Sequence, residues 1–217
     1  MKKIVSVLLL VVICLAALSS CGKTDKMGTG ACTYLETRDI TGRSVQYVEM
    51  CVEGYGRMVI LLDSTTAPKT VAHFTALVRI GFYDGKTFHR IEPELVLQGG
   101  CPNANGTGGI VTKLDGEFAE NGWENDIQHR KGVIAMARGE DYNSASCQFY
   151  ICNDNSYELD GEYATFGYVV EGLSVIDDIT ADRVKYGDPS NYYIIDNKDD
   201  QPVIKYIKLL EKWTPES

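Results

Sequence analysis

The stretch 88–100 constrains the fold of this chain more than any other, because it combines a strand-like pattern with polar side chains that strands rarely bury. Two short apolar segments are separated by Pro93, and a glycine-rich loop at 106–109 follows. Side chains alternate between the two faces of a strand, so Arg90 and Gln98 lie among apolar neighbours. Three explanations are open for Arg90: it pairs with a carboxylate in the core, it lies on a solvated sheet face, or it serves a functional site. This stretch alone favours the first two.

A second stretch downstream has the same character. Residues 133–138 form an apolar run that ends in an arginine, and residues 144–151 place Gln148 inside an aromatic strand. Short motifs occur along the chain in this order: Phe-His-Arg-Ile at 88–91, Gln-Gly-Gly at 98–100, Gly-Thr-Gly-Gly at 106–109, Met-Ala-Arg at 136–138, Gln-Phe-Tyr-Ile at 148–151, Leu-Asp-Gly at 159–161 and Phe-Gly at 166–167. In this order they resemble the cyclophilin-type peptidyl-prolyl isomerases, and the resemblance covers about residues 44–210. Composition and periodicity alone would not indicate this family.

Local patterns predict a mainly β fold with two helices. Residues 44–52 and 57–63 read as a hairpin, and a helix is expected from Pro68 to Gly81 because apolar residues recur there at spacings of three and four. The chain should continue with a strand at 161–170, a helix at 173–179, a polar insertion at 182–200 and a strand at 202–210. Many short strands and two helices favour a closed, largely antiparallel barrel. The resemblance implies eight strands capped by a helix at each end.

The N-terminus has the pattern of an export signal. Residues 1–20 contain a basic start and an apolar run that is short for a membrane helix, and they end just before Cys21. The sequence Leu-Ser-Ser-Cys at 18–21 resembles a bacterial lipobox, in which the cysteine is acylated with diacylglycerol and becomes the mature N-terminus. An ordinary secretory signal is the alternative. We expect three parts: a lipoprotein signal peptide at 1–20, a lipid-anchored flexible spacer at 21–43 and a cyclophilin-like isomerase domain at 44–212.

The charge of the chain limits its partners. The 217 residues carry a formal net charge of -9, which becomes -11 when Lys2 and Lys3 leave with the signal. An acidic protein repels nucleic acid phosphates and anionic lipid headgroups. We therefore expect no nucleic acid partner, and we also expect a monomer. We expect it in the cell envelope, facing outside the cytoplasm, with a membrane attachment that depends on the N-terminal lipid.

No metal or cofactor is expected. The three histidines, at 73, 89 and 129, are not accompanied by paired carboxylates at ligand spacing, and we interpret them as structural or surface residues. The loop at 106–109 lacks the Gly-Lys-Ser/Thr ending of a phosphate-binding loop, so it is read as a turn.

The resemblance assigns roles to the polar residues of both stretches. Arg90 matches the family's catalytic arginine, whose guanidinium bonds near the prolyl carbonyl and nitrogen and favours a pyramidal nitrogen. Gln98 matches the glutamine that holds the substrate backbone and supports the arginine, and Gln148 matches the second glutamine of the groove. Ala137 and Arg138 match the segment that pairs with the peptide main chain. Because many relatives have asparagine at the second of these positions, only a backbone role is expected for Arg138.

The family's proline pocket falls on residues that mostly differ from the usual ones. Where relatives carry a Phe-Met pair, an aromatic, a leucine and a histidine, this chain has Leu95, Val96, Tyr150, Leu159 and Tyr163. The lining stays apolar and partly aromatic. Since Leu95 and Val96 are smaller than phenylalanine and methionine, a looser pocket and a lower rate are expected.

Two functions follow from these residues. The first is a peptidyl-prolyl cis-trans isomerase that acts on flexible or unfolded proline-containing segments of exported proteins. The second is a proline-peptide-binding chaperone or surface-binding lipoprotein that keeps the groove and has little catalysis. Retention of Arg90, Gln98 and Gln148 favours the enzyme, whereas the small residues Leu95 and Val96 favour the binding protein.

Overall fold

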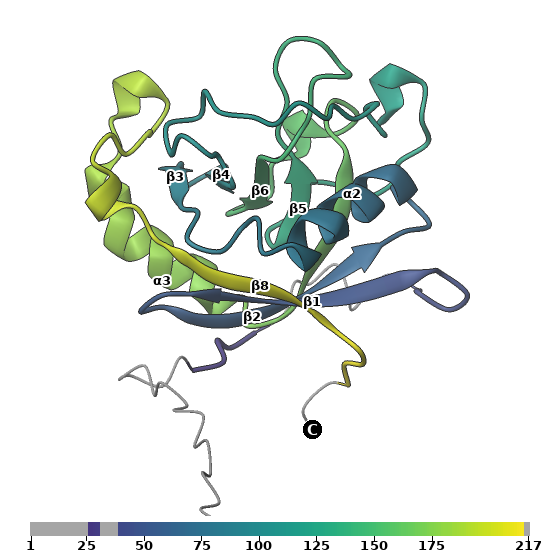
Figure 1. Cartoon of the computed structure of the whole chain (residues 1–217), viewed down its shortest axis with the longest axis horizontal. Helices are drawn as coiled ribbons and strands as arrows, with labels where there is room; N and C mark the ends of the chain where they lie inside the picture. The colour runs from purple at the N-terminus through teal and green to yellow at the C-terminus, as the bar shows by residue number, and fades with distance from the viewer. Residues whose placement is uncertain (1–25, 31–38, 215–217) are drawn as a thin grey trace, which may run out of the picture.

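The computed structural model describes residues 26–30 and 39–214, so the predicted signal peptide and Cys21 lie outside the described residues. Eight antiparallel strands form one curled sheet in the order β3-β4-β6-β5-β7-β2-β1-β8, and two longer helices, α2 and α3, pack against it (Figure 1). The strands are β1 Val45–Val52, β2 Gly56–Asp63, β3 Phe88–Ile91, β4 Val96–Gly99, β5 Val133–Met136, β6 Phe149–Cys152, β7 Thr165–Glu171 and β8 Ile204–Leu210. The helices are α2 Pro68–Arg79 and α3 Ser174–Arg183, with the short 3-10 turns η1 Ala119–Asn121, η2 Tyr157–Leu159, η3 Val184–Tyr186, η4 Pro189–Asn191 and η5 Lys198–Asp200. None of the helices in this part of the chain is long and apolar enough to cross a membrane.

The predicted hairpin is confirmed as β1 and β2. Their ladder runs from Val45 opposite Asp63 to Val52 opposite Gly56. Strand β2 also holds the short N-terminal piece 26–30, part of the segment expected to be a spacer. The amide of Arg57 in β2 donates to the carbonyl of Lys26 at 2.8 Å, which bonds this piece to the domain.

Helix α2 begins and ends where its sequence predicts. Pro68 occupies its first turn, and Gly81, just beyond its end, has φ +67°. Its N-cap residue makes no side-chain hydrogen bond. Instead, the buried carboxylate of Glu117 accepts the amide N–H groups of Lys69 at 2.9 Å and Thr70 at 2.8 Å. A carboxylate at this place satisfies free amides and complements the helix dipole.

The curled sheet has an apolar cluster on each of its faces. On the face covered by the helices, the ring of Phe74 in α2 lies 5.0 to 5.6 Å from the rings of Tyr83, Phe149 and Phe166. The next residue of β6, Tyr150, points to the opposite face and packs in a second cluster. The alternation of a strand thus gives β6 one side chain in the core and one on the face that carries the predicted site.

The barrel is open, which corrects the expectation of a closed one. The terminal strands β3 and β8 share no ladder beyond their first residues. Their beginnings are joined by an isolated bridge between Thr87 and Val203, with backbone hydrogen bonds from Phe88 to Pro202 at 3.0 Å and from Ile204 to Lys86 at 2.7 Å. The reason lies in the predicted insertion. Its residue Ile195 donates its amide to the carbonyl of His89 at 2.8 Å, and Ile194 bridges Arg90, so this segment occupies the free edge of β3.

Candidate active site

A row of polar side chains crosses β3, β4 and β6, and it contains the residues predicted to be catalytic. Arg90 is the cross-strand partner of Gln98, and Gln98 that of Tyr150, so these side chains share one face of the sheet. The Nη1 of Arg90 donates to Oε1 of Gln98 at 3.4 Å, and Nε2 of Gln98 donates to Oε1 of Gln148 at 3.0 Å. Gln148 in turn donates to the carbonyl of Gly106 at 2.8 Å. The three residues that the sequence singles out are therefore one hydrogen-bonded unit.

Arg90 has two further partners, which sequence reasoning missed. Its Nη2 forms an ion pair with Glu92, and its Nε donates to the carbonyl of Tyr192 at 2.9 Å. The side chain is 22% exposed, so it is neither deep in the core nor on an open surface. The strand pattern places Glu92 on the face of Arg90, since residues two apart share a strand face, but the ion pair between them was not predicted. No sequence signal indicated Tyr192, which lies in the polar insertion.

An open hollow of about 290 Å³ lies beside the glutamines. Its lining combines backbone-rich loops with a few polar side chains: Gln98, Gly106–Gly109, Lys113, Ala137–Gly139, Ser144, Ser146 and Gln148. The predicted residues Ala137 and Arg138 thus border the groove. The amide of Ala137 is already used in a 3.0 Å bond to the carbonyl of Gln148.

The side chain of Arg138 is held by its surroundings. Its guanidinium lies 4.7 Å from the ring centroid of Tyr163, 4.8 Å from that of Tyr142 and 5.3 Å from that of Phe118. Its Nε donates to the carbonyl of Glu162 at 2.9 Å. These cation–π contacts and hydrogen bonds fix the side chain along the wall of the groove.

The five residues predicted for the proline pocket lie together. Leu95, Leu159 and Tyr163 are partly buried and pack on the cluster that contains the buried Val96 and Tyr150. The rings of Tyr150 and Tyr163 meet edge to face at 5.7 Å. Tyr150 is the cross-strand partner of Gln98, so this apolar, partly aromatic cluster adjoins the row of polar residues. Val96 and Tyr150 are buried in it, and none of the five residues lines the hollow beside the glutamines.

A hydrogen-bond chain through His129 and Asp160 fixes the hydroxyl of Tyr150. This hydroxyl lies 3.0 Å from Nε2 of His129, whose Nδ1 lies 2.8 Å from the carboxylate of Asp160. Burial lowers the pKa of His129 and outweighs the opposing effect of Asp160, so the ring is neutral at pH 7. A carboxylate only accepts, so Nδ1 carries the proton and Nε2 accepts from Tyr150. Burial also raises the pKa of Tyr150 well above its usual value, and the hydroxyl stays a donor.

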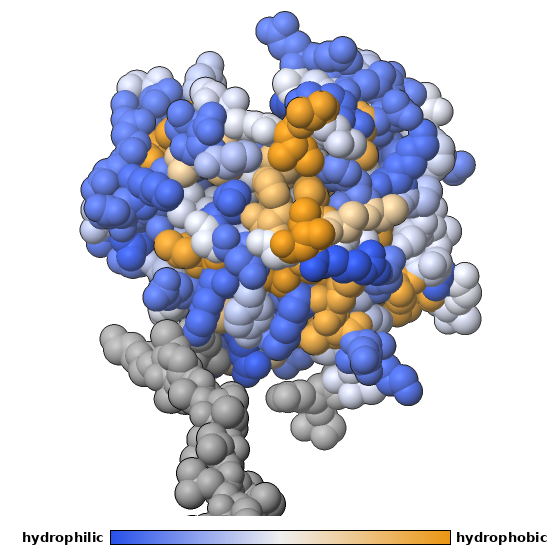
Figure 2. All heavy atoms as spheres, in the orientation of Figure 1, coloured by the Kyte–Doolittle hydropathy of each residue, from blue (hydrophilic) through white to orange (hydrophobic). Residues whose placement is uncertain are grey.

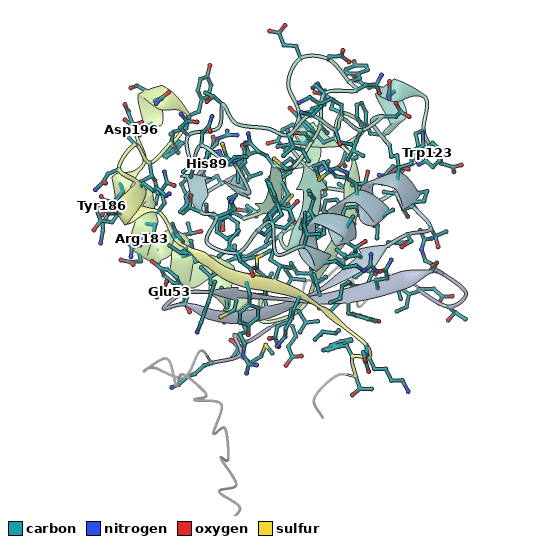
Figure 3. The ribbon with its side chains drawn as sticks, viewed as in Figure 1. Glu53, His89, Trp123, Arg183, Tyr186 and Asp196 are labelled. Atoms are coloured by element: carbon teal, nitrogen blue, oxygen red, sulfur yellow. The ribbon has the colours of Figure 1, made fainter. Side chains whose placement is uncertain are left out.

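The other two histidines are structural as well. Nε2 of His73 bonds to the carbonyl of Ser146 at 2.6 Å. His89 lies in β3 and is buried, and burial together with the neighbouring Arg90 lowers its pKa to about 4. Figure 3 labels His89 beside β3. Within the described residues, no group of three or more His, Cys, Asp or Glu side chains could hold a metal ion.

Comparison with known proteins gives one consistent result. A family model described as cyclophilin type peptidyl-prolyl cis-trans isomerase/CLD matches residues 47–203. A peptidyl-prolyl cis-trans isomerase of Synechococcus elongatus is 42% identical over 109 residues, which cover 50% of this chain and 70% of that relative. One from Helicobacter pylori is 38% identical over 136 residues, or 61% of this chain and 77% of the relative.

Solved structures agree with the sequence relatives. A cyclophilin type isomerase of Cryptosporidium parvum superposes with a TM-score of 0.67 at 25% identity and covers 78% of this chain and 99% of its own. Its structure in the presence of the dipeptide Ala-Pro gives a TM-score of 0.66 at 26% identity, with coverage of 77% and 100%. With the fold, the site and these relatives in agreement, the chain belongs to the cyclophilin-type peptidyl-prolyl cis-trans isomerases, and it is an enzyme of that type.

Proposed function

We propose that this isomerase works by Arg90-assisted twisting of X-Pro bonds in exported proteins. Rotation about such a bond meets a barrier of roughly 20 kcal/mol, because the nitrogen lone pair is delocalised into the carbonyl. No covalent bond breaks and no proton leaves. The protein therefore has to bind the twisted amide more strongly than the planar one, and each 1.4 kcal/mol or so of that preference gives about tenfold in rate.

One observation carries the proposal: the row from Arg90 through Gln98 to Gln148 adjoins the apolar cluster of Tyr150 and Tyr163, because Tyr150 is the cross-strand partner of Gln98. A prolyl ring on that cluster would place its nitrogen and the preceding carbonyl near the guanidinium. The cation would then stabilise the localised lone pair and the carbonyl oxygen of the twisted amide. The Ala-Pro dipeptide of the Cryptosporidium relative supports an X-Pro segment as the ligand.

The test is the isomerisation rate of a prolyl peptide with Arg90 replaced. Arg90→Ala should lower kcat/KM by roughly tenfold to a thousandfold, whereas the melting temperature should stay close to that of the wild type. Arg90→Lys keeps the charge and loses the planar fork of donors, so it should recover only part of the rate. Arg79→Ala, which removes an exposed arginine at the end of α2, is the matched control and should leave the rate unchanged. Full activity in a normally melting Arg90→Ala protein would refute the catalytic role.

We further propose that the enzyme is a monomeric lipoprotein of the bacterial cell envelope, anchored through Cys21 and facing outside the cytoplasm. The lipobox-like sequence at 18–21 supports this, and the acidic charge of the chain argues against nucleic acid as a partner. Mass spectrometry of the native N-terminus should find an acylated Cys21, and Cys21→Ser should release the protein from the membrane fraction or leave it uncleaved. An unmodified Cys21 would refute the anchor.

The small residues at the pocket favour one alternative. Leu95 and Val96 are smaller than phenylalanine and methionine and offer less apolar area to a prolyl ring. A smaller contact is what we expect of a binding protein with weak catalysis. Wild-type protein that binds a proline peptide by calorimetry but accelerates no prolyl peptide would decide for this alternative.

A further inference from the structure

The segment between α3 and β8, residues 184–201, covers the free edge of β3 and reaches the proposed catalytic arginine. Figure 1 shows this yellow-green segment beside β3, and Figure 3 places Tyr186 and Asp196 on it. Figure 2 shows a mostly hydrophilic surface over it. A polar surface loop would normally need no functional explanation. This one buries side chains in the core and bonds directly to Arg90, so its contacts need such an explanation.

The covering segment is anchored from within. Ile195 is 1% exposed and belongs to the core cluster. The buried side chain of Gln201 accepts from the hydroxyl of Thr87 and donates to the carbonyls of Ala104 at 2.8 Å and Ile195 at 2.6 Å. With the backbone bond from Ile91 to the carbonyl of Tyr193 at 3.2 Å, these contacts fix the segment relative to β3. Its position is therefore specified by buried groups.

Two tyrosines of the covering segment adopt an uncommon backbone conformation. Tyr192 has φ +54° and Tyr193 has φ +58°, in the left-handed region that favours glycine and asparagine. Strain of this kind persists only where the surrounding structure imposes it, and it is concentrated at functional sites. Here the turn directs the carbonyl of Tyr192 to Nε of Arg90 at 2.9 Å. The side chain of Tyr192 is 73% exposed and contributes little packing.

Three of the N–H groups of the Arg90 guanidinium donate hydrogen bonds within the protein. Nε donates to the carbonyl of Tyr192, Nη2 to the carboxylate of Glu92 and Nη1 to the side chain of Gln98. A guanidinium has five N–H donors, so one N–H on each Nη is left for a substrate. Fixed in this way, the side chain loses little freedom when a substrate binds, and preorganised donors cost no rearrangement during the reaction.

We propose that the covering segment positions Arg90 for catalysis through the backbone carbonyl of Tyr192, which makes Tyr192 a positioning residue. The inference rests on the proposed function of Arg90 and adds to it a part of the chain outside the groove. The left-handed backbone at Tyr192 and Tyr193 orients the carbonyl of Tyr192 toward Nε of Arg90.

The experiment separates the carbonyl of Tyr192 from its ring. In Tyr192→Val the β-branched side chain disfavours the left-handed conformation, so the carbonyl should turn away from Arg90. Tyr192→Asn also removes the ring but tolerates that conformation, and it is the matched control. Tyr192→Thr repeats the first test with a polar β-branched side chain. We expect Tyr192→Val and Tyr192→Thr to lose roughly fivefold to fiftyfold in kcat/KM, as misplacement of a catalytic group can cause, and Tyr192→Asn to keep wild-type activity.

A second readout does not depend on activity. The Nε–H of Arg90 should give a protected resonance in nitrogen-15 NMR spectra of the wild type and of Tyr192→Asn. In Tyr192→Val this resonance should shift and exchange with water. In an Arg90→Ala background, Tyr192→Val should lower the rate no further, because positioning acts only through the arginine.

The outcomes distinguish failure of this inference from failure of the proposed function. If Arg90→Ala is impaired but Tyr192→Val keeps wild-type activity or an unchanged Nε–H resonance, positioning is refuted and catalysis by Arg90 stands. Equal losses in Tyr192→Val and Tyr192→Asn would show that the ring matters and would also refute it. Full activity in Arg90→Ala would refute both.

Discussion

The buried imidazole of His89 makes stability depend on pH. Its side chain is 1% exposed, and its Nδ1 finds no hydrogen-bond partner among the described residues. Burial, and then the charge of Arg90, lowers its pKa from the ordinary 6.5 to about 4. The ring is therefore neutral in the folded protein at neutral pH. On acidification, the unfolded chain takes up this proton first.

The sign and size of the effect follow from these two pKa values. Between pH 6.5 and 4 the unfolded state binds more protons than the folded state, so the free energy of unfolding falls as the pH falls. At 1.36 kcal/mol for each pKa unit, His89 should remove about 2 kcal/mol by pH 5 and about 3 kcal/mol by pH 4. Above pH 7 it should have no pH-dependent effect.

The assay is urea unfolding of the wild type and of His89→Phe at several pH values from 7.5 to 4. His129, whose pKa burial also lowers, titrates in the same direction in both proteins, so the difference between them isolates His89. That difference should change by about 2 kcal/mol from pH 7.5 to pH 5 in favour of the phenylalanine variant. A difference that stays constant over this range would refute the reasoning.

Three further substitutions test contacts that support the site. Glu117→Ala removes the carboxylate that caps α2 and should cost about 2 kcal/mol in urea unfolding; an unchanged midpoint would contradict the capping role. Tyr150→Phe leaves Nε2 of the buried His129 without its donor and should cost roughly 1 to 3 kcal/mol while peptide isomerisation continues. In Gly167→Ala the new Cβ would lie 2.1 Å from the carbonyl oxygen of Leu61, so a loss of roughly 3 kcal/mol or failure to fold is expected, and wild-type melting would contradict the tight packing.

Local patterns predicted those parts of the fold that neighbouring residues decide. The hairpin of β1 and β2, the start of α2 at Pro68 and the αL glycine after its end all follow from such patterns. The strand expected at 161–170 begins only at Thr165, because Gly161 has φ +82° and the chain turns there before it joins the sheet. The cap of α2 could not be foreseen, since Glu117 is far from the helix in sequence and only the tertiary fold brings it to the first turn.

The row of polar residues was predictable because it depends on motifs and register. Arg90 and Gln98 lie on paired strands, and Gln148 is the residue just before β6. Short motifs therefore suffice to place all three residues in the row. The two structural alternatives weighed for Arg90 were both partly right, because it pairs with a carboxylate and is partly exposed, and its functional role is a proposal. The buried polar chain behind Tyr150 was not foreseen. Its hydroxyl is satisfied by His129, a residue that the sequence showed only as a solitary histidine.

The open barrel and the environment of Arg90 escaped prediction for the same physical reason. The polar residues of 184–201 read as a solvated insertion, yet Ile195 is buried in the core and the side chain of Gln201 makes buried hydrogen bonds. Once anchored there, the segment supplies carbonyl and amide groups to residues 89–91 at the edge of β3. The same pairing brings Tyr192 to Arg90. The barrel is therefore open at β3, the strand that carries the proposed catalytic residue. The backbone of residues 184–201 lies along this edge, and its carbonyl at Tyr192 holds the guanidinium of Arg90.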